Sequence, residues 1–459
     1  MSAVLASPAV SRSSRLDTVR ALQHTLYRTA KADPGRRFHA LMDKVFRKDV
    51  LARAWFEVRR NNGAPGIDRA TLADVEGYGV ARLLGELAVE LEEGRYRPLP
   101  ARRVMIPKPG SAELRPLSIP SVRDRVVQAA LKIVLEPVLE ADFLPCSFGF
   151  RPRRSAHDAL QVIIDEAWRG RRWVVETDIA SCFTAIPHEE LMRAVGERVC
   201  DQSVLKLLRV ILRAGVMADG QVRREVTGTP QGGVISPALC NVYLHRLDRQ
   251  WDVREFGVLV RFADDLLVMC KSAQQAEAAL ARLRQLLAGL GLEPKEAKTA
   301  IVGLEEGGPG FDFLGFHHQM VRSRGLRGTR GVVFLARWPA NKAMQHARDQ
   351  IRELTGRSRQ MLGVAAVVQD VNMFLRGWAA YFKYGHSALR FDKIRNYAMQ
   401  RLAIYIGGRH KRGRAFGLNV VAYRSPDQCG LISLTGIVVP PRANKPWRER
   451  PNTGGERRR

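Results

Sequence analysis

The stretch that decides the fold is Gly257–Cys270, with the sequence GVLVRFADDLLVMC. Two apolar runs, at 258–260 and 266–269, flank Ala263-Asp264-Asp265, and this pattern predicts two paired strands joined by a tight turn. Two carboxylates side by side at the bend repel each other, and the apolar flanks do not solvate them. A buried turn therefore needs a cation or a proton beside it, whereas an exposed turn that simply favours Asp needs neither.

A second stretch supplies a third carboxylate. Residues 173–177 have a short strand pattern that ends at Asp178, and a carboxylate there can meet the Asp264-Asp265 pair across a sheet. Oxygen ligands around two hard divalent ions are what in-line nucleotidyl transfer requires, because one metal activates a 3′-hydroxyl while the other stabilises the leaving pyrophosphate. The two stretches together predict the palm of a polymerase.

The charge of the chain points to a polyanionic partner. The 459 residues, enough for two or three domains, include 74 Lys or Arg and 46 Asp or Glu, a net charge of +28. Residues 321–459 hold 28 basic and 7 acidic side chains, a net of +21, which leaves +7 for residues 1–320. The C-terminal third is therefore expected to contact nucleic acid, although a solvated face that only keeps the protein in solution remains an alternative.

Cysteine spacing and hydropathy exclude several classes of protein. The six cysteines are scattered without a C-x-x-C pair, so neither a disulfide framework nor a zinc site is expected, and a reducing compartment fits. No run of 18 or more apolar residues predicts a membrane span. The first 16 residues lack acidic groups, which is typical either of a frayed terminus or of an organelle transit peptide.

Four longer motifs connect these stretches. They are T-D-I-x-x-C-F at Thr177–Phe183, T-P-Q-G-G-x-x-S-P-x-L at Thr229–Leu239, F-A-D-D at Phe262–Asp265 and F-L-G-F at Phe313–Phe316. In this order and at these intervals, the chain resembles a group II intron reverse transcriptase, also called an intron-encoded maturase. The resemblance extends from about residue 61 to about residue 414.

The resemblance implies an α+β fold of the right-hand polymerase type, in which fingers and a palm with an antiparallel sheet precede an α-helical thumb and maturase domain. It divides the chain into an N-terminal extension at 1–60, fingers and palm at 61–330, the thumb and maturase domain at 331–408 and a basic nucleic-acid-binding tail at 409–459. Helices are expected near 71–93, 236–249 and 276–290, and in the thumb near 341–356, 360–384 and 390–406. Residues 409–414 and the stretch from Pro440 are expected to be flexible basic arms.

The resemblance also assigns the site. Asp178, Asp264 and Asp265 are expected to be catalytic and, with the backbone carbonyl of Ile179, to hold two Mg²⁺ ions. Contacts with the deoxynucleoside triphosphate are expected from Lys108, Arg115, Phe183 and Gln231. Contacts with primer or template are expected from Pro230, Gly232, Phe262, Lys298, Phe313, Leu314 and Gly315.

Some of these residues have a plainer alternative reading. Lys108 and Arg115 lie on two short strands that form a flap able to close on phosphates, but they are also typical of solvated surface charges. Phe183 is expected to exclude a 2′-hydroxyl by a steric clash, and the alternative is an ordinary core phenylalanine. The two phenylalanines of the F-L-G-F motif are likewise ordinary core residues in most strands.

The chain departs from the family pattern in two places. Phe262 stands where the family commonly has Tyr, so ring packing is retained without the hydroxyl and catalysis is expected to survive. No C-x-x-C pair and no closely spaced His, Cys and Asn cluster follows Arg414, which argues against the metal-dependent endonuclease domain of some relatives. Insertion is then expected to use a pre-existing DNA end.

The implied function is that of an RNA-directed DNA polymerase, a nucleotidyltransferase, that assists splicing of its intron RNA and copies it into DNA during retrohoming. Its expected partners are intron RNA, the RNA–DNA hybrid, target DNA and deoxynucleoside triphosphates, without a membrane, in a bacterial-type cytoplasm. Two alternatives remain open: an RNA-binding splicing maturase with little polymerase role, and a domesticated relative that works in defence or repair without an intron.

Overall fold

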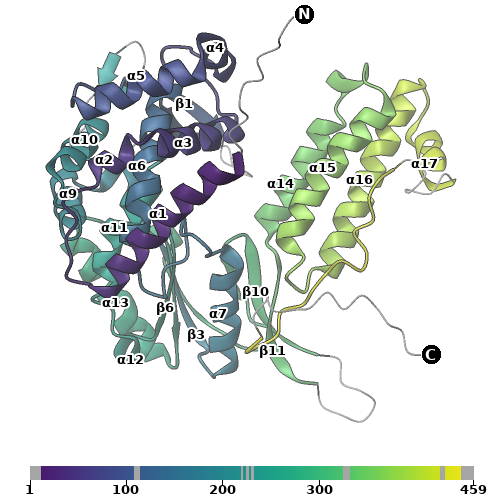
Figure 1. The fold of residues 1–459 in the computed structure, drawn as a ribbon. Helices are drawn as coiled ribbons and strands as arrows, with labels where there is room; N and C mark the ends of the chain where they lie inside the picture. Colours follow the sequence, from purple (N-terminus) through teal and green to yellow (C-terminus); the bar gives the residue numbers. More distant parts are fainter. Residues whose placement is uncertain are drawn as a thin grey trace, which may run out of the picture.

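The structure is a computed structural model that describes residues 12–107, 114–218, 221–223, 227–228, 232–323, 331–423 and 430–445. Figure 1 shows a larger body of helices and sheets, purple to teal, and a bundle of long helices, green to yellow, beside it. The α+β class predicted from the sequence is confirmed. None of the helices in the described part of the chain is both long and apolar enough to cross a membrane.

Helices build the N-terminal side of the body. They are α1 (Arg12–Ala32), α2 (Met42–Val45), α3 (Lys48–Asn61), α4 (Leu72–Tyr78), α5 (Val80–Glu92) and α6 (Val122–Glu140). Most side chains of α6 are buried, and this helix packs against both α1 and α3. The single helix predicted over 71–93 is wrong: a capping box at Thr71 starts α4, but Gly79 has φ +105°, which breaks the helix and separates α4 from α5.

A four-stranded sheet with the order β2-β1-β4-β5 follows the first helices. Its strands are β1 (Ala101–Pro107), β2 (Leu114–Ile119), β4 (Val216–Ala218) and β5 (Gln221–Arg223). Strands β1 and β2 are antiparallel, with Ile106 opposite Arg115, so the predicted strand pair is present. Between β2 and β4, beyond α6, lie α8 (Cys182–Ala185), α9 (His188–Gly196) and α10 (Gln202–Leu212).

The central sheet has the order β6-β7-β3-β8, and every neighbouring pair in it is antiparallel. Its strands are β3 (Trp173–Asp178), β6 (Val258–Phe262), β7 (Asp265–Cys270) and β8 (Ala300–Gly303). Helices α11 (Ser236–Asp248), α12 (Val253–Phe256) and α13 (Ala273–Gly289) and a 3₁₀ turn (Glu296–Lys298) connect and cover these strands. Leu266 belongs to the hydrophobic core that includes α11 and α13, whereas Leu267 belongs to the core that includes α7 (Ala156–Trp168). Because both faces are covered, β7 is a continuous apolar run.

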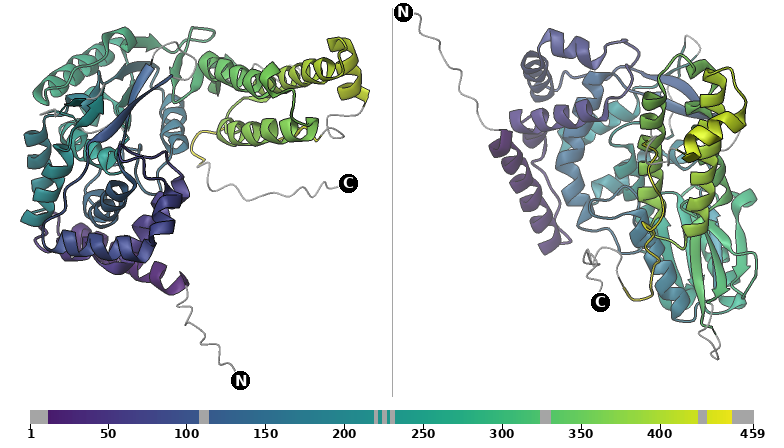
Figure 2. Two further views of the ribbon diagram at one scale, coloured as in Figure 1. Left: turned by 90° about the horizontal axis from the view of Figure 1, so that it is seen from above. Right: turned by 90° about the vertical axis from the view of Figure 1, so that its right-hand side faces the viewer.

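A third sheet, of order β11-β10-β9, joins the body to the helical bundle. Its strands are β9 (Phe311–Phe313), β10 (Phe316–Arg322) and β11 (Val333–Pro339). The bundle consists of α14 (Asn341–Leu354), a 3₁₀ turn (Arg357–Arg359), α15 (Val364–Phe382), α16 (Ala388–Arg409) and α17 (Arg414–Tyr423). The three thumb helices predicted from the sequence are therefore present, and the bundle stands beside the body in the left view of Figure 2.

Residues 430–445, which we call the crossing segment, return from the bundle to the body. Asn372 on α15 binds it at both ends of one turn, donating to the Gly430 carbonyl (2.5 Å) and accepting from the Ile432 N–H (2.9 Å). The Val439 N–H donates to the Lys383 carbonyl at 2.7 Å, just after α15. On the body side, the Gln161 side chain of α7 donates to the Arg442 carbonyl at 2.9 Å. The flexible arm predicted from Pro440 is therefore wrong for 440–445, which are bound to α7.

Candidate active site

Residues 257–270 form the predicted hairpin. Phe262 and Asp265 are the last opposed pair of β6 and β7, so Ala263 and Asp264 make a two-residue turn. Ala263 has φ +57° and is buried. Gly149 packs so closely on this turn that a Cβ atom there would lie 2.4 Å from the Ala263 nitrogen. The turn is packed against the body, so the alternative of an exposed Asp-favouring turn is wrong.

Three carboxylates meet at this turn. Asp178, the last residue of β3, lies directly opposite Asp265 in the antiparallel β3–β7 pair. The next residue, Ile179, donates its N–H to the Asp264 carbonyl with an N to O distance of 3.1 Å. Opposed Cα atoms in such a pair are about 4.5–5.5 Å apart. The structure therefore brings together the residues that were predicted to share two cations.

The local electrostatics favour extra positive charge. Burial, followed by the charges of Asp264 and Asp178, raises the pKa of Asp265 to about 7. Burial and the charge of Asp178 also raise the pKa of Asp264. The Lys298 Nζ lies 2.5 Å from Oδ2 of Asp178. Burial lowers the pKa of Lys298, but this bond and the charges of the three aspartates together outweigh burial and raise it. One ammonium therefore faces three crowded carboxylates, an arrangement that a divalent cation stabilises.

The donor atoms decide which metal suits this cluster. They are carboxylate and backbone oxygens, the ligands of hard ions such as Mg²⁺. In the described ranges, no three His, Cys, Asp or Glu side chains are already arranged to hold a metal ion. One oxygen of Asp178 is also taken by Lys298. The donors thus fit magnesium chemically, although their side chains are not arranged around an ion in this structure.

The raised pKa of Asp265 predicts a pH dependence of stability in the presence of EDTA. Between about pH 4 and pH 7 the unfolded chain has lost the Asp265 proton while the folded chain keeps it, so stability falls as pH rises through this range. Asp265→Asn should therefore flatten the fall in the thermal midpoint measured from pH 4.5 to pH 8. The exposed Asp43→Asn variant should keep the wild-type slope. Identical slopes in wild type and Asp265→Asn would contradict the raised pKa.

Arg115 is the predicted nucleotide-binding residue that the structure places beside the carboxylates. It is exposed on β2, and its positive charge lowers the pKa of Asp264, against the dominant effect of burial. Arg115 is therefore near enough to the turn for its charge to act on Asp264. Lys108, Gln231 and Pro230 lie outside the described residues.

The glycine-rich motif packs against the same strand. Gly232 has φ +113°, and a Cβ atom there would lie 2.4 Å from the Ser118 carbonyl oxygen on β2. Only glycine fits this approach. Phe183 is partly buried in α8 and packs against the body core, and Phe262 is partly buried opposite Asp265. Phe183 therefore fits both interpretations, a core phenylalanine and a steric gate against a 2′-hydroxyl, because its ring packs on the core but is only partly buried.

The F-L-G-F motif lies at the junction with the bundle. Leu314 and Gly315 form the turn between β9 and β10, with φ of +48° and +77°. The Tyr381 hydroxyl of α15 donates to the Leu314 carbonyl at 2.9 Å, and the Ala340 N–H donates to the Gly315 carbonyl at 2.9 Å. Phe313 is buried, so its ring is a core residue, while the turn itself is fixed against the bundle.

Comparison with known families finds a match for the body and another for the helical bundle. Residues 106–318 match the model of the family described as reverse transcriptase (RNA-dependent DNA polymerase), and residues 344–420 match the group II intron maturase-specific domain. The protein YkfC of Escherichia coli K12 is 36% identical over 355 residues, which cover 68% of this chain and 91% of YkfC. The chain belongs to the group II intron reverse transcriptase and maturase family. It therefore carries an RNA-dependent DNA polymerase domain.

Two further relatives of this reverse transcriptase either have a lower sequence identity or are aligned over only part of their length. The group II intron-encoded protein LtrA of Lactococcus lactis subsp. cremoris is 37% identical over 212 residues, which cover 46% of this chain and 35% of LtrA. An uncharacterized 91 kDa protein in the cob intron of Schizosaccharomyces pombe is 27% identical over 466 residues, covering 84% of this chain and 57% of that protein. The chain thus spans about a third of LtrA.

A buried ion pair supports the Asp264-Asp265 hairpin of this reverse transcriptase, and the sequence analysis did not assign it. The side chains of Arg261 on β6 and Asp248 on α11 are fully buried and paired through Nε–Oδ1 (2.8 Å) and Nη2–Oδ2 (2.6 Å). The Arg261 Nη1 donates to the Asn241 side chain (2.9 Å) and to the Ala263 carbonyl (3.2 Å). The guanidinium therefore ties the turn to α11. The available signal was a charged residue inside an otherwise apolar strand.

Glu176 is the second acidic residue that the sequence analysis missed. It lies two residues before Asp178, on the same face of β3. Burial, followed by the charges of Asp312 and Asp265, raises its pKa to about 7. Partial protonation of Glu176 at neutral pH therefore limits the negative charge near Asp265. The alternation along β3 was the signal that could have found it.

Proposed function

We propose that this chain is the RNA-directed DNA polymerase of a group II intron, which copies the intron RNA into DNA and assists its splicing. The carrying observation is that Asp178 faces Asp265 beside Asp264 within the matched reverse transcriptase region. The maturase-specific match that follows supports a role with intron RNA. Binding and synthesis share one basic surface in this proposal, so the two roles coexist.

In this proposal, Asp178, Asp264, Asp265 and the Ile179 carbonyl hold two Mg²⁺ ions. When bound, magnesium supplies positive charge that activates the primer 3′-hydroxyl and stabilises the leaving pyrophosphate. Lys298 stays beside the carboxylates as a cation for the nucleotide or the primer end, which its bond to Asp178 supports. Arg115 approaches the triphosphate from β2, as its electrostatic effect on Asp264 supports.

The proposed domains are those of a right-hand polymerase: an extension at 1–60, fingers and palm at 61–330, a thumb from 331 and a basic tail. The family matches end at 318 and resume at 344, and these positions bracket the proposed boundary between palm and thumb. Helix α17 packs on α16, and the maturase-specific match continues to 420. For this reason we move the end of the thumb from 408 to the end of α17.

The proposed partners are intron RNA, an RNA–DNA hybrid, target DNA and deoxynucleoside triphosphates. Phosphates are held by Lys and Arg, which are concentrated in residues 321–459 with a net charge of +21. Counterions are released when such contacts form, so affinity for an RNA–DNA duplex falls steeply as salt is raised. These phosphate contacts do not distinguish one nucleotide sequence from another.

Phe183 is proposed to select deoxynucleotides, which predicts a change in substrate preference. Phe183→Val removes the edge of the ring and should raise the ratio of kcat/KM for ribonucleotides over deoxynucleotides by about 10- to 100-fold. Single-nucleotide extension with both substrates on one protein sample measures this ratio, and any loss of folded protein cancels from it. Phe56→Val, at an exposed ring on α3, should leave the ratio unchanged. An unchanged ratio in Phe183→Val would assign the ring to the core alone.

The splicing part of the proposal is tested with the RNA that flanks the coding frame. Transcribed RNA is incubated at a magnesium concentration too low for self-splicing, with wild-type protein or with Asp265→Asn. Both proteins should accelerate splicing equally, whereas only the wild type should extend a DNA primer on the same RNA. No acceleration by either protein would refute the maturase role, and equal DNA synthesis by both would refute the metal assignment.

A further inference from the structure

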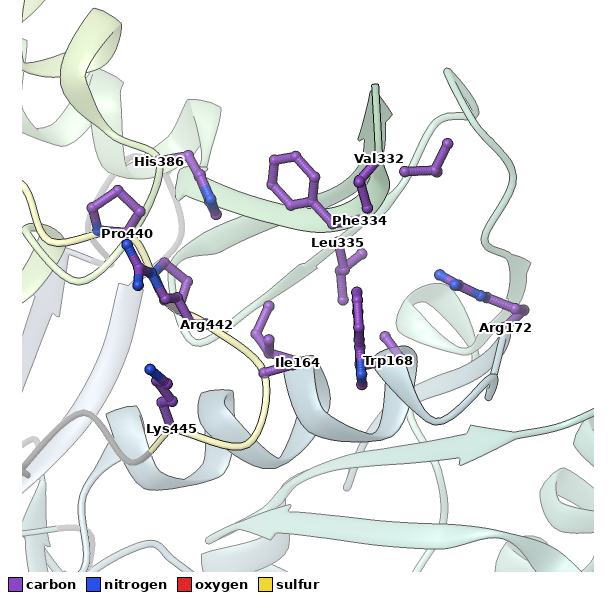
Figure 3. Close-up of a pocket in the computed structure, with 14 residues that line it drawn as sticks. Ile164, Trp168, Arg172, Val332, Phe334, Leu335, His386, Pro440, Arg442 and Lys445 are labelled. Carbon is purple, nitrogen blue, oxygen red and sulfur yellow. The ribbon is translucent and has the colours of Figure 1, made fainter. Parts of the chain in front are cut away.

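A cavity of about 540 Å³ lies between helix α7, strand β11 and the crossing segment. Figure 3 shows Ile164 and Trp168 on α7 pointing toward Phe334 and Leu335 of β11, which form its apolar walls. Cationic side chains stand at both ends. They are Arg172 at one end and Arg442 and Lys445 at the other. Among the described residues that line the cavity, none is acidic.

The ring of Trp168 lines the cavity and is exposed. Trp168 is the last residue of α7 and remains 57% exposed although it lines an apolar wall. A ring with a free face is a platform on which a nucleobase stacks, whatever the base. His386 adds a polar group to the lining. Burial and then the charge of Arg337 lower its pKa to about 4, so at neutral pH it is an uncharged imidazole that suits the edge of a base.

The two cations of the crossing segment are held in place by their backbone. The Arg442 carbonyl accepts from the Gln161 side chain at 2.9 Å, and the Asn444 N–H donates to the Asp165 carboxylate at 2.6 Å. The same Oδ1 atom of Asp165 also accepts from the Gln161 side chain at 2.9 Å. Within the described chain, the exposed side chains of Arg442 and Lys445 form no ion pair. The backbone at this end of the cavity is therefore fixed, and it presents two exposed cationic side chains that an anion can bind.

The cavity is separate from the catalytic turn. Arg172 comes immediately before Trp173, the first residue of β3, and Asp178 is the last residue of that strand. At about 3.3 Å per residue, the two ends are about 20 Å apart. A ligand here is therefore not the nucleotide that reacts at the carboxylates.

We propose that this cavity is a second nucleic-acid site, which binds single-stranded RNA with one base stacked on Trp168 and flanking phosphates on Arg172, Arg442 and Lys445. An apolar slot between cations matches an anionic chain of flat bases, and unpaired RNA presents its bases in this way. RNA is favoured because the crossing segment begins ten residues after the end of the maturase-specific match. The site rests on the proposed role with intron RNA and deepens it, and it requires neither magnesium nor DNA synthesis.

Photo-crosslinking tests the site on the full chain. A short oligouridine that carries 5-iodouridine is titrated at low salt while excess RNA–DNA duplex occupies the catalytic cleft, and crosslinked peptides are identified by mass spectrometry. We expect crosslinks within 164–172 and 440–445. Trp168→Leu should weaken binding at the 440–445 crosslink by about 10-fold, the loss of one stacked base. Arg442→Gln with Lys445→Gln should weaken it and reduce its salt dependence.

Arg169→Gln is the matched control, because Arg169 follows Trp168 but is paired with Glu166 and does not line the cavity. It should bind as wild type does. Absence of crosslinks in both segments, as when the cavity is filled by the chain itself or by a second copy, would overturn the proposal. Equal occupancy by the matching deoxyuridine oligomer would overturn the assignment to RNA. Trp168→Leu should still extend a primer on a short template, so failure here is distinguishable from failure of the proposed polymerase role.

Discussion

Asp264→Asn should reduce DNA synthesis on an RNA template by a factor of about 10³ or more. The substitution keeps the shape of the side chain but removes one of three converging carboxylates, and a loss of about 4 kcal/mol of transition-state stabilisation corresponds to this factor. Primer extension with purified protein, at saturating deoxynucleotide and several magnesium concentrations, measures the effect.

The folded state of the same variant gives an independent check. Because burial and the charge of Asp178 raise the pKa of Asp264, the neutral side chain should fold at least as stably as the wild type in EDTA. Asp43→Asn, at an exposed carboxylate paired only with its neighbour Lys44, should synthesise DNA normally. Appreciable synthesis by folded Asp264→Asn would remove this carboxylate from the reaction.

Asp248→Asn should lower the free energy of unfolding of the body by about 3–5 kcal/mol. The substitution leaves the Arg261 guanidinium fully buried without its counter-charge, which is far costlier than losing an exposed pair. Urea unfolding followed by tryptophan fluorescence measures the loss. DNA synthesis should fall as well, even at temperatures where the variant is folded, because Arg261 also holds the Ala263 carbonyl.

Two further variants test whether burial of the ion pair causes the loss of stability in Asp248→Asn. Asp349→Asn breaks an exposed i,i+3 pair with Arg352 and should cost less than about 1 kcal/mol. Replacing both partners, with Asp248→Leu and Arg261→Met, should recover much of the stability lost in Asp248→Asn, since no unpaired charge remains buried. If Asp248→Asn and Asp349→Asn cost the same, the buried pair does not anchor the hairpin.

Local pattern was sufficient to predict the hairpin, its upstream partner strand and the bundle. The runs that flank Ala263-Asp264-Asp265 and the strand that ends at Asp178 form the predicted elements, and their register places Asp178 opposite Asp265. The helix breaks were less visible. Gly79 lies inside a helical pattern, and only its left-handed φ separates α4 from α5. Periodicity does not contain that information.

Contacts between residues far apart in the chain could not be predicted from the sequence. Arg261 stands out as a charged residue in an apolar strand, but its pairing with Asp248 depends on how α11 packs behind β6. Likewise, the Pro- and Arg-rich composition of the stretch from Pro440 is typical of a solvated arm. Its backbone nevertheless bonds to Gln161 and Asp165 on α7, because α7 presents an amide and a carboxylate that composition does not reveal.

The crossing segment has a consequence for biosynthesis. Residues 430–445 leave the ribosome after residues 12–423, and they make the bonds that run from α15 and Lys383 to α7. During translation, the polymerase core and the helical bundle are thus both complete before this tie between them exists. A ribosome stalled before residue 430 would carry a nascent chain without this anchor, so the tie between body and bundle forms only after the crossing segment has been synthesised.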